Sequence, residues 1–335
     1  AYMARDVNDC YGLGHPKAVE NAIHMIKANF NLTIEPKLTD YLSCKIKFDK
    51  LKEKAWLGQP HLIKNLDKKF GEMVKSGQTY RTPGTPGLGI IRPKEGDLTI
   101  SEEDQTLYRS GVGMLLYLVK HSRPDIANSV RELSKSMSGV TEAAFKELKR
   151  VIKFVLDTRT YGLKLQPKAV TEDEHWSMTV FTDSDWAGDK DNRISITGYI
   201  VFLLGAPILW KSKAQKSVSL SSTEAEYYAL SEAAKEIKFV VQILLSMGIP
   251  VQLPVIVRVD NMGAIFMSEN ASASSRTKHV DTRYHFVREF VEDGFIRIVF
   301  VRTVDNVSDS FTKNVTGDIY EAHVKEIITD RTYLE

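Results

Sequence analysis

Two acidic residues each end an apolar segment that has the composition of a buried β-strand. Asp183 closes residues 176–183 (WSMTVFTD), and Asp260 closes residues 254–260 (PVIVRVD). Open α/β folds place their sites at the ends of strands, so both carboxylates are expected at one edge of a sheet. Mg²⁺ prefers oxygen ligands, and two such ions about 4 Å apart can hydrolyse a phosphodiester. Because either acid alone is commonly an ordinary loop residue, the hypothesis depends on their combination.

Further acids lie at the start of a long predicted helix and near the C-terminus. In residues 222–247, Glu226 shares a face with apolar residues, whereas Glu224 lies on a more polar face. A carboxylate that faces a sheet is costly unless it has a partner or a metal. A first-turn acid such as Glu224 is instead favoured by the helix dipole. Asp309, in NVSDSFTK, opens a short helix, where capping is the ordinary alternative.

Composition excludes several classes of protein. A length of 335 residues indicates roughly two domains. The formal net charge is only +2, so any nucleic-acid-binding surface must be local. Cys10 and Cys44 make neither a disulfide framework nor a metal-binding spacing, which favours a reducing intracellular environment. We find no apolar run that could span a membrane and no secretory signal, so the protein is expected to be intracellular and not secreted.

The second half alternates strands and helices, which predicts an α/β fold with helices packed on a mixed sheet. The expected strands are residues 176–183, 197–204, 207–211, 254–260 and 295–301. The helix at 222–247 precedes the fourth strand, and one further helix is expected before the fifth.

The first half is expected to be mostly helical behind a small strand-bearing start. The helical periodicity covers residues 16–30, 60–74, 104–120, 124–137 and 141–157, and residues 41–48 are strand-like. Prolines and glycines exclude regular structure from most of residues 82–97. Residues 165–172, with Pro167 and the start of an acidic run, have the composition of a linker.

Five motifs in the second half resemble the ribonuclease H domain of copia-type retrotransposon polyproteins. They are FTDSDWAGDKDNRISITGY, KSVSLSSTEAEYYAL, VRVDNMGAI, SRTKHVDTRYHFVRE and NVSDSFTKNV, and they cover about residues 175–315. The resemblance implies that the metal-binding acids are Asp183, Glu226, Asp260 and Asp309. It also implies that two Mg²⁺ or Mn²⁺ ions assist hydrolysis of the RNA strand of an RNA–DNA hybrid. RNA would be distinguished from DNA by its 2′-hydroxyl.

The upstream motifs resemble the same polyprotein, from the end of the reverse transcriptase palm through its thumb and connection. They include DCYGLGHPKAVENAI, LGQPHLIKNLDKKFG, YRTPGTPG and LYRSGVGMLLYLVKHSRPDIA. In the family, paired aspartates lie in a Tyr-x-Asp-Asp turn, but here Asn8 replaces the first and only Asp9 remains. The fingers and the segment with the first catalytic aspartate do not precede this turn. An amide does not replace the charge of a carboxylate on Mg²⁺, so we expect no polymerase activity.

The resemblance divides the chain into four parts. They are the truncated end of the palm (1–50), a thumb and connection region (51–168), the ribonuclease H domain (172–316) and a helical tail (317–335). The implied partners are an RNA–DNA hybrid and other parts of the same polyprotein, without a membrane. The implied location is the cytoplasm, in a virus-like particle, or the nucleus.

Local basic clusters are candidates for contacts with nucleic-acid phosphates. One comprises Lys211, Lys213 and Lys216, which are expected between the third strand and the long helix. A second comprises Arg276, Lys278, Arg283 and Arg288, with His279 in an exposed loop beside it. A third, Lys146, Lys149, Arg150 and Lys153, is equally compatible with an ordinary solvated helix face. His285 and Trp210 are expected to be packed, and Trp186 is left undecided.

Two alternatives to a nuclease remain. The chain could be an idle nucleic-acid-binding remnant, which Asn8 favours and the complete set of acids opposes. It could also be a polymerase that needs a partner subunit for its missing palm, which the altered turn opposes. Stabilisation by Mg²⁺ that depends on Asp183 would separate a nuclease from an idle remnant.

Overall fold

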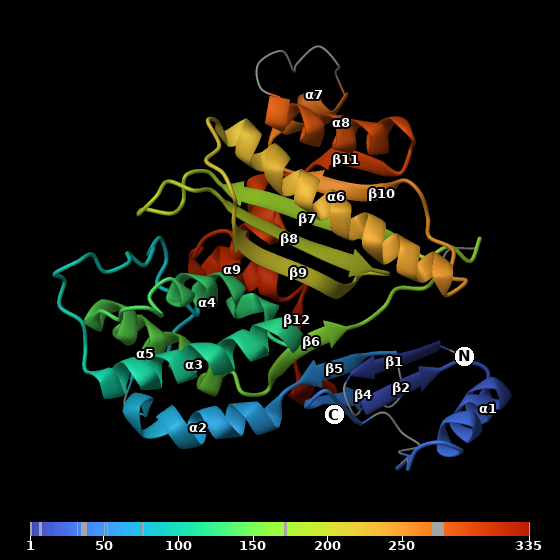
Figure 1. Ribbon diagram of the computed structural model, residues 1–335, viewed down its shortest axis with the longest axis horizontal. Helices are drawn as coiled ribbons and strands as arrows, with labels where there is room; N and C mark the ends of the chain where they lie inside the picture. The colour runs from blue at the N-terminus through green and yellow to red at the C-terminus, as the bar shows by residue number, and fades with distance from the viewer. Residues whose placement is uncertain are drawn as a thin grey trace.

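The computed structural model describes residues 2–6, 9–31, 33–34, 39–49, 51, 53–75, 77–170, 173–269 and 278–334. Within them lie a mixed five-stranded sheet, an antiparallel five-stranded sheet and a two-stranded hairpin (Figure 1). The mixed sheet belongs to the second half of the chain, and helices from both halves cover it.

The mixed sheet has the strand order β11-β10-β7-β8-β9. Its strands are β7 (Met178–Asp185), β8 (Ile196–Leu203), β9 (Ala206–Ala214), β10 (Val255–Val259) and β11 (Ile296–Phe300). β7, β8 and β9 pair antiparallel in sequence order, whereas β10 pairs parallel with both β7 and β11. The α/β class predicted for this half is therefore confirmed. β9 continues to Ala214, so Lys211 and Lys213 lie within this strand. The sequence had instead predicted that they lie after the third strand, before the long helix.

Three helices and one face of the mixed sheet share a hydrophobic core. The helices are α6 (Ser222–Ser246), α7 (Met262–Glu269) and α8 (Lys278–Glu292). The core includes Val180 and Val257 from the strands and Leu230, Ile265 and Val287 from the helices. The sequence predicted only one helix between β10 and β11, whereas the structure has two.

The upstream half supplies helices and most of the antiparallel sheet. The helices are α2 (Pro60–Val74), α3 (Glu102–His121), α4 (Ala127–Ser134), which a 3₁₀ turn precedes (Pro124–Ile126), and α5 (Glu142–Asp157). The sheet has the order β12-β6-β5-β4-β3. Its strands are β3 (Asp40–Tyr41), β4 (Cys44–Phe48), β5 (Ala55–Gly58), β6 (Tyr161–Leu165) and β12 (Ile328–Asp330).

The C-terminal tail returns to the upstream half. Two 3₁₀ turns, η3 (Thr303–Asp305) and η4 (Val307–Phe311), follow β11 and lead to α9 (Gly317–Val324). β12 then pairs antiparallel with β6, and a last 3₁₀ turn (Arg331–Leu334) follows. The second face of the mixed sheet packs here: Ile200 and Phe202 share a core with Leu133 of α4 and Phe311 of η4. The two halves of the chain therefore share this second core.

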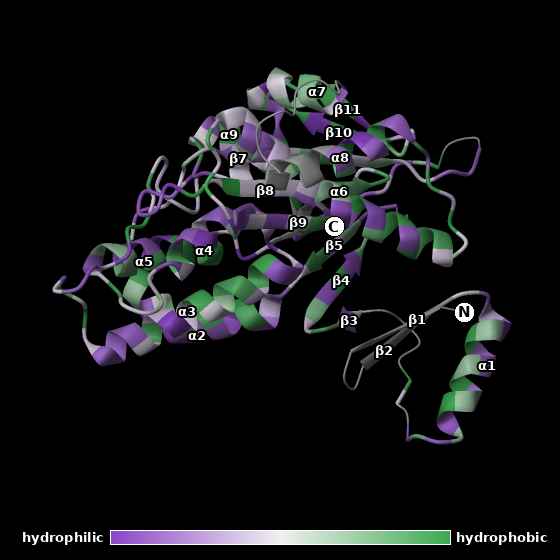
Figure 2. Cartoon of the chain, turned by 45° about the horizontal axis from the view of Figure 1, so that its top comes forward, coloured by the Kyte–Doolittle hydropathy of each residue, from purple (hydrophilic) through white to green (hydrophobic). Residues whose placement is uncertain are grey.

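The N-terminal elements lie at one end of the molecule, away from the mixed sheet (Figures 1 and 2). β1 (Tyr2–Asp6) pairs with β2 (Asp9–Leu13), and α1 (Pro16–Lys27) follows. The described residues of α1 are not buried, and Met25 is 74% exposed. In the described part of the chain, no helix combines the length and apolar character that crossing a membrane requires.

Candidate metal centre

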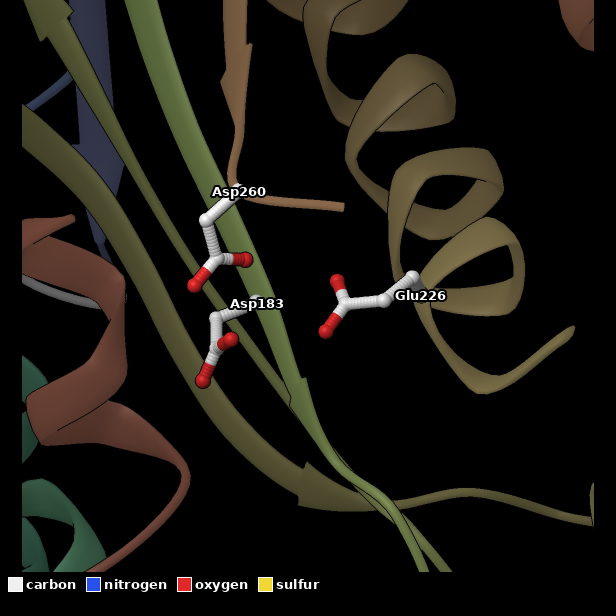
Figure 3. A group of neighbouring side chains, drawn as sticks. All are labelled: Asp183, Glu226 and Asp260. Carbon is white, nitrogen blue, oxygen red and sulfur yellow. The ribbon is translucent and has the colours of Figure 1, made fainter. Parts of the chain in front are cut away.

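Asp183, Glu226 and Asp260 come together at one edge of the mixed sheet (Figure 3). Each offers a carboxylate oxygen, and these oxygens lie within 4.8 Å of one another. Asp183 lies near the end of β7, and Asp260 directly follows β10. In Figure 3 the side chain of Glu226 points toward both aspartates from α6. The structure thus brings together three of the four acids that the sequence singled out.

Local sequence explains why these side chains meet. β7 and β10 are parallel neighbours, so their C-terminal ends lie at the same edge of the sheet. α6 begins beside that edge, where the Ser221 side chain accepts a hydrogen bond from the backbone N–H of Glu224. Ala225 and Ala229 are fully buried, and such small residues let the helix approach β7 closely. Glu226 therefore lies over the strand ends.

Glu224 has a different role from Glu226, although only two residues separate them. Its carboxylate accepts a hydrogen bond of 2.7 Å from the backbone N–H of Leu220. Together with the Ser221 cap, this bond satisfies N–H groups at the helix start. Glu224 therefore stabilises the beginning of α6 and is not one of the three clustered acids.

The cluster is buried, and its negative charges oppose one another. Asp183 is only 4% exposed and Glu226 only 5% exposed. Burial, followed by the charges of Asp309 and Asp260, raises the pKa of Asp183 to about 7. Burial and the charges of Asp183 and Asp260 raise the pKa of Glu226 well above its usual value. Ionising this group without a compensating cation is therefore costly.

One oxygen in the cluster lacks any partner among the described residues. The backbone N–H of Ser184 donates to Oε1 of Glu226 at 3.1 Å. Oε2 of Glu226 is buried and accepts no hydrogen bond. Buried carboxylate oxygens normally have a partner, and three converging carboxylates are the donor set that Mg²⁺ and Mn²⁺ prefer. The residues present therefore fit a divalent cation.

Asp309 lies beside the cluster on η4 and is paired with a lysine. It is 3% exposed, and its Oδ1 lies 2.5 Å from Nζ of Lys313. The side-chain amide of Asn306 donates to the carbonyl of Thr182 at 3.1 Å, and the hydroxyl of Thr312 donates to Asp183 at 2.5 Å. These two bonds hold the Asp309 segment against β7. Asp309 is close enough to raise the pKa of Asp183, although it is not one of the three clustered acids.

The sequence analysis did not predict that Lys313, Thr312 and Asp185 lie beside the metal centre. Lys313 and Thr312 follow Asp309 within the quoted motif NVSDSFTKNV, which was the available signal. Asp185 lies two residues after Asp183 in β7, so alternation places both on one face of the strand. Burial raises the pKa of Asp185, against the lowering effect of Lys313 and Arg131.

The first basic cluster is on the surface. Lys211, Lys213 and Lys216 are all exposed. Lys211 pairs in register with Tyr199, whose side chain belongs to the core beneath α6. Residues paired across neighbouring strands share a face, so Lys211 and Lys213 lie on the α6 side of the sheet, the side from which Glu226 reaches the cluster.

The other basic candidates have mixed outcomes. Arg276 lies outside the described residues, and for Lys278, His279 and Arg283 only the backbone is described, in α8. His279 is thus in a helix and not in the predicted loop. Arg288 is buried, because its helix face packs into the core, and it does not belong to an exposed cluster. His285 is exposed, so the prediction that it packs was wrong.

In the third basic group, Arg150 and Lys153 make contacts with other side chains of the protein. Arg150 lies over the ring of Tyr80, 4.0 Å from its centroid, and donates to Thr82. Lys153 pairs with Asp157. Trp210 packs against the core that joins the halves and donates to the carbonyl of Val119 in α3, as expected of a packed residue.

Trp186 is partly exposed and hydrogen-bonded, and Asp9 of the degenerate polymerase turn lies in the N-terminal hairpin. Trp186 is 48% exposed, and its indole N–H donates to the carbonyl of Ser219 at 3.0 Å. Asn8 lies outside the described residues, and Asp9 begins β2, opposite Asp6 in the hairpin.

The fold and the comparisons define the class of protein. Three antiparallel strands, a helix, and two parallel strands with acids at their ends form a ribonuclease H-like domain. The chain is 32% identical to the Pol polyprotein of transposon RE1 from Arabidopsis thaliana, over 97% of this chain and 21% of that protein. It is 37% identical to that of transposon RE2 from the same plant, over 67% of this chain and 15% of that protein.

The chain belongs to the Pol polyproteins of copia-type retrotransposons. It spans 21% of the length of the RE1 polyprotein and 15% of the RE2 polyprotein. A solved structure, LC11-RNase H1 isolated from compost, is 15% identical with a TM-score of 0.31, covering 44% of this chain and 96% of that one. A scan of protein-family models finds no match.

Proposed function

We propose that this chain hydrolyses the RNA strand of RNA–DNA hybrids with the help of two Mg²⁺ or Mn²⁺ ions. The observation that carries this proposal is the convergence of Asp183, Glu226 and Asp260, with one buried Glu226 oxygen left without a partner. Membership of the Pol polyproteins supports it, because the motif resemblance implies that these three acids and Asp309 are the metal-binding residues. An idle remnant would have no need to keep buried carboxylates whose charges repel one another.

Each side chain has a definite task in this proposal. Asp183, Glu226 and Asp260 would hold one divalent cation, and Asp309 would be a ligand of the second. Thr312 fixes the carboxylate of Asp183 through its short hydrogen bond. The chemistry supplied by two bound ions is activation of water and stabilisation of the departing 3′ oxygen.

The exposed lysines would bind the substrate. Lys211, Lys213 and Lys216 would contact phosphates and so provide affinity without sequence preference. Lys278, His279, Arg283 and Arg276 are proposed as a second contact region. Contact with the 2′-hydroxyl would select RNA at the cut strand.

We also propose that this chain does not extend primers, because Asn8 replaces an aspartate of the polymerase turn. It would act inside the cell, alongside other parts of its polyprotein. Primer extension by the purified chain with template, primer and Mg²⁺ would contradict this part of the proposal.

Incubation of the chain with a labelled RNA–DNA hybrid and Mg²⁺ or Mn²⁺ tests the nuclease directly. The parent should cut the RNA strand, whereas Asp260→Asn should be slower by a factor of about 100 or more, because a ligand charge is lost. Equal inactivity of both proteins, with hybrid still bound, would overturn the nuclease in favour of an idle remnant.

A further inference from the structure

Lys313 places its own positively charged ammonium group beside the acidic residues of the metal centre. Its ammonium lies 2.5 Å from Oδ1 of buried Asp309, although its side chain is 47% exposed. The ammonium therefore reaches from solvent to the one acid of the four that lies beside the cluster.

The residues on either side of Lys313 fix its position. Thr312 donates to Asp183 at 2.5 Å. The amide oxygen of Asn314 accepts hydrogen bonds of 2.9 Å from both Asn128 and Ser129 of α4, and its amide nitrogen donates to the carbonyl of Leu88 at 3.1 Å. The backbone of Lys313 is thus anchored to the cluster on one side and to the upstream half on the other.

We infer that Lys313 is the internal counter-cation of Asp309, and that a second divalent cation must displace its ammonium to reach this carboxylate. The inference rests on the proposed function, since it concerns the second of the two ions. Among the described residues no ion pair is formed with Asp183, Glu226 or Asp260, so the first ion has no direct ion pair to displace. Lys313 therefore sets the cation concentration at which the site fills completely.

Titration calorimetry with Mn²⁺ and with Ca²⁺ on the full chain tests this assignment without requiring cleavage. In Lys313→Gln the second ion should bind roughly tenfold more tightly, because a competing charge is removed next to a buried carboxylate. Lys313→Arg, which keeps the charge, should bind it as the parent does. Lys325→Gln removes an exposed lysine after α9 and should leave both affinities unchanged.

Unchanged or weaker binding of the second ion by Lys313→Gln would overturn the assignment, as would equal tightening in Lys325→Gln. Urea unfolding in EDTA identifies a variant that fails to fold, in which case Lys313→Met replaces it.

Hybrid cleavage on the same samples separates the two proposals. A parent that binds two ions without cleaving overturns the nuclease alone. A parent that cleaves, with an unchanged second affinity in Lys313→Gln, overturns the lysine assignment alone.

Discussion

The surroundings of the Asp183 carboxyl group act on both its position and its charge. It is buried, it accepts a hydrogen bond from Thr312, and the charges of Asp309 and Asp260 act on it. These surroundings favour its neutral form in the metal-free protein. A bound divalent cation would reverse this preference, because an adjacent positive charge stabilises the carboxylate.

The raised pKa of Asp183 predicts a pH-dependent stability of the metal-free protein. The folded value of about 7 lies above the ordinary value of 3.8. The folded protein therefore binds more protons between these values, and the contribution of Asp183 is lost as the pH rises toward 7. Asp183→Asn, which stays neutral, should gain thermal stability over the parent as the pH increases from about 5 to about 8 in EDTA. A difference in Tm that does not change with pH would contradict this explanation.

Among single residues, the sequence predicted the acids of the metal centre but not the side chains that contact those acids. Asp183 and Asp260 were found because each ends an apolar strand, and Glu226 was preferred through its family motif. Thr312 and Lys313 were not found, because their roles arise from the fold of η4 against β7. That contact joins segments more than a hundred residues apart, and no local pattern encodes it.

Among the elements, η4 depends on a glycine in the neighbouring strand. Gly198 pairs in register with Asp183, and η4 lies directly over it. A Cβ atom at Gly198 would lie 2.7 Å from Cγ2 of Thr312 and 2.9 Å from the carbonyl of Ser308. Only glycine lets the turn approach the strand closely enough for Thr312 to reach Asp183.

Gly198→Ala should therefore push η4 away from β8 and disturb the metal centre. We expect a loss of about 1–3 kcal/mol in the free energy of unfolding, as is typical of overpacking, together with slower hybrid cleavage. Gly113→Ala is a matched control, because nothing lies within 4 Å of a Cβ at that exposed position in α3. Urea unfolding that leaves Gly198→Ala as stable as Gly113→Ala would show that η4 tolerates the methyl group.

The elements with strong periodicity were predicted most accurately. α2 begins and ends where the apolar spacing and Pro60 predicted. α7 was missed because it has only eight residues and no clear apolar stripe. β12 was missed because three residues form a strand only by pairing with β6, which lies far away in sequence.

At the scale of the whole molecule, the tail fastens the ribonuclease H-like domain to the upstream half. The hydroxyl of Tyr320 in α9 donates to the carboxylate of Asp125 at 3.0 Å, and Asp125 also pairs with the fully buried Arg123. On the surface, Arg81 pairs with Asp318 and Glu321. The separate tail that the sequence suggested stays a prediction, but its residues pack on the upstream half.

Tyr320→Phe should destabilise the whole chain and not one half. Removing the hydroxyl leaves an oxygen of buried Asp125 with one partner fewer, at a cost of about 1–3 kcal/mol. Because the halves share a core, urea unfolding should remain a single transition at a lower midpoint. Tyr117→Phe removes a more exposed hydroxyl and should change the stability by less than about 0.5 kcal/mol. Two separate transitions in the parent would contradict a shared core.

The most direct test of the metal centre compares two glutamates on one helix. Glu226→Gln and Glu224→Gln change the same group two positions apart, so they differ in place and not in chemistry. With Mg²⁺ and a labelled RNA–DNA hybrid, Glu226→Gln should lose cleavage of the RNA strand, and Glu224→Gln should retain it. Retained cleavage in Glu226→Gln, or equal loss in both variants, would contradict a cation site formed by Asp183, Glu226 and Asp260.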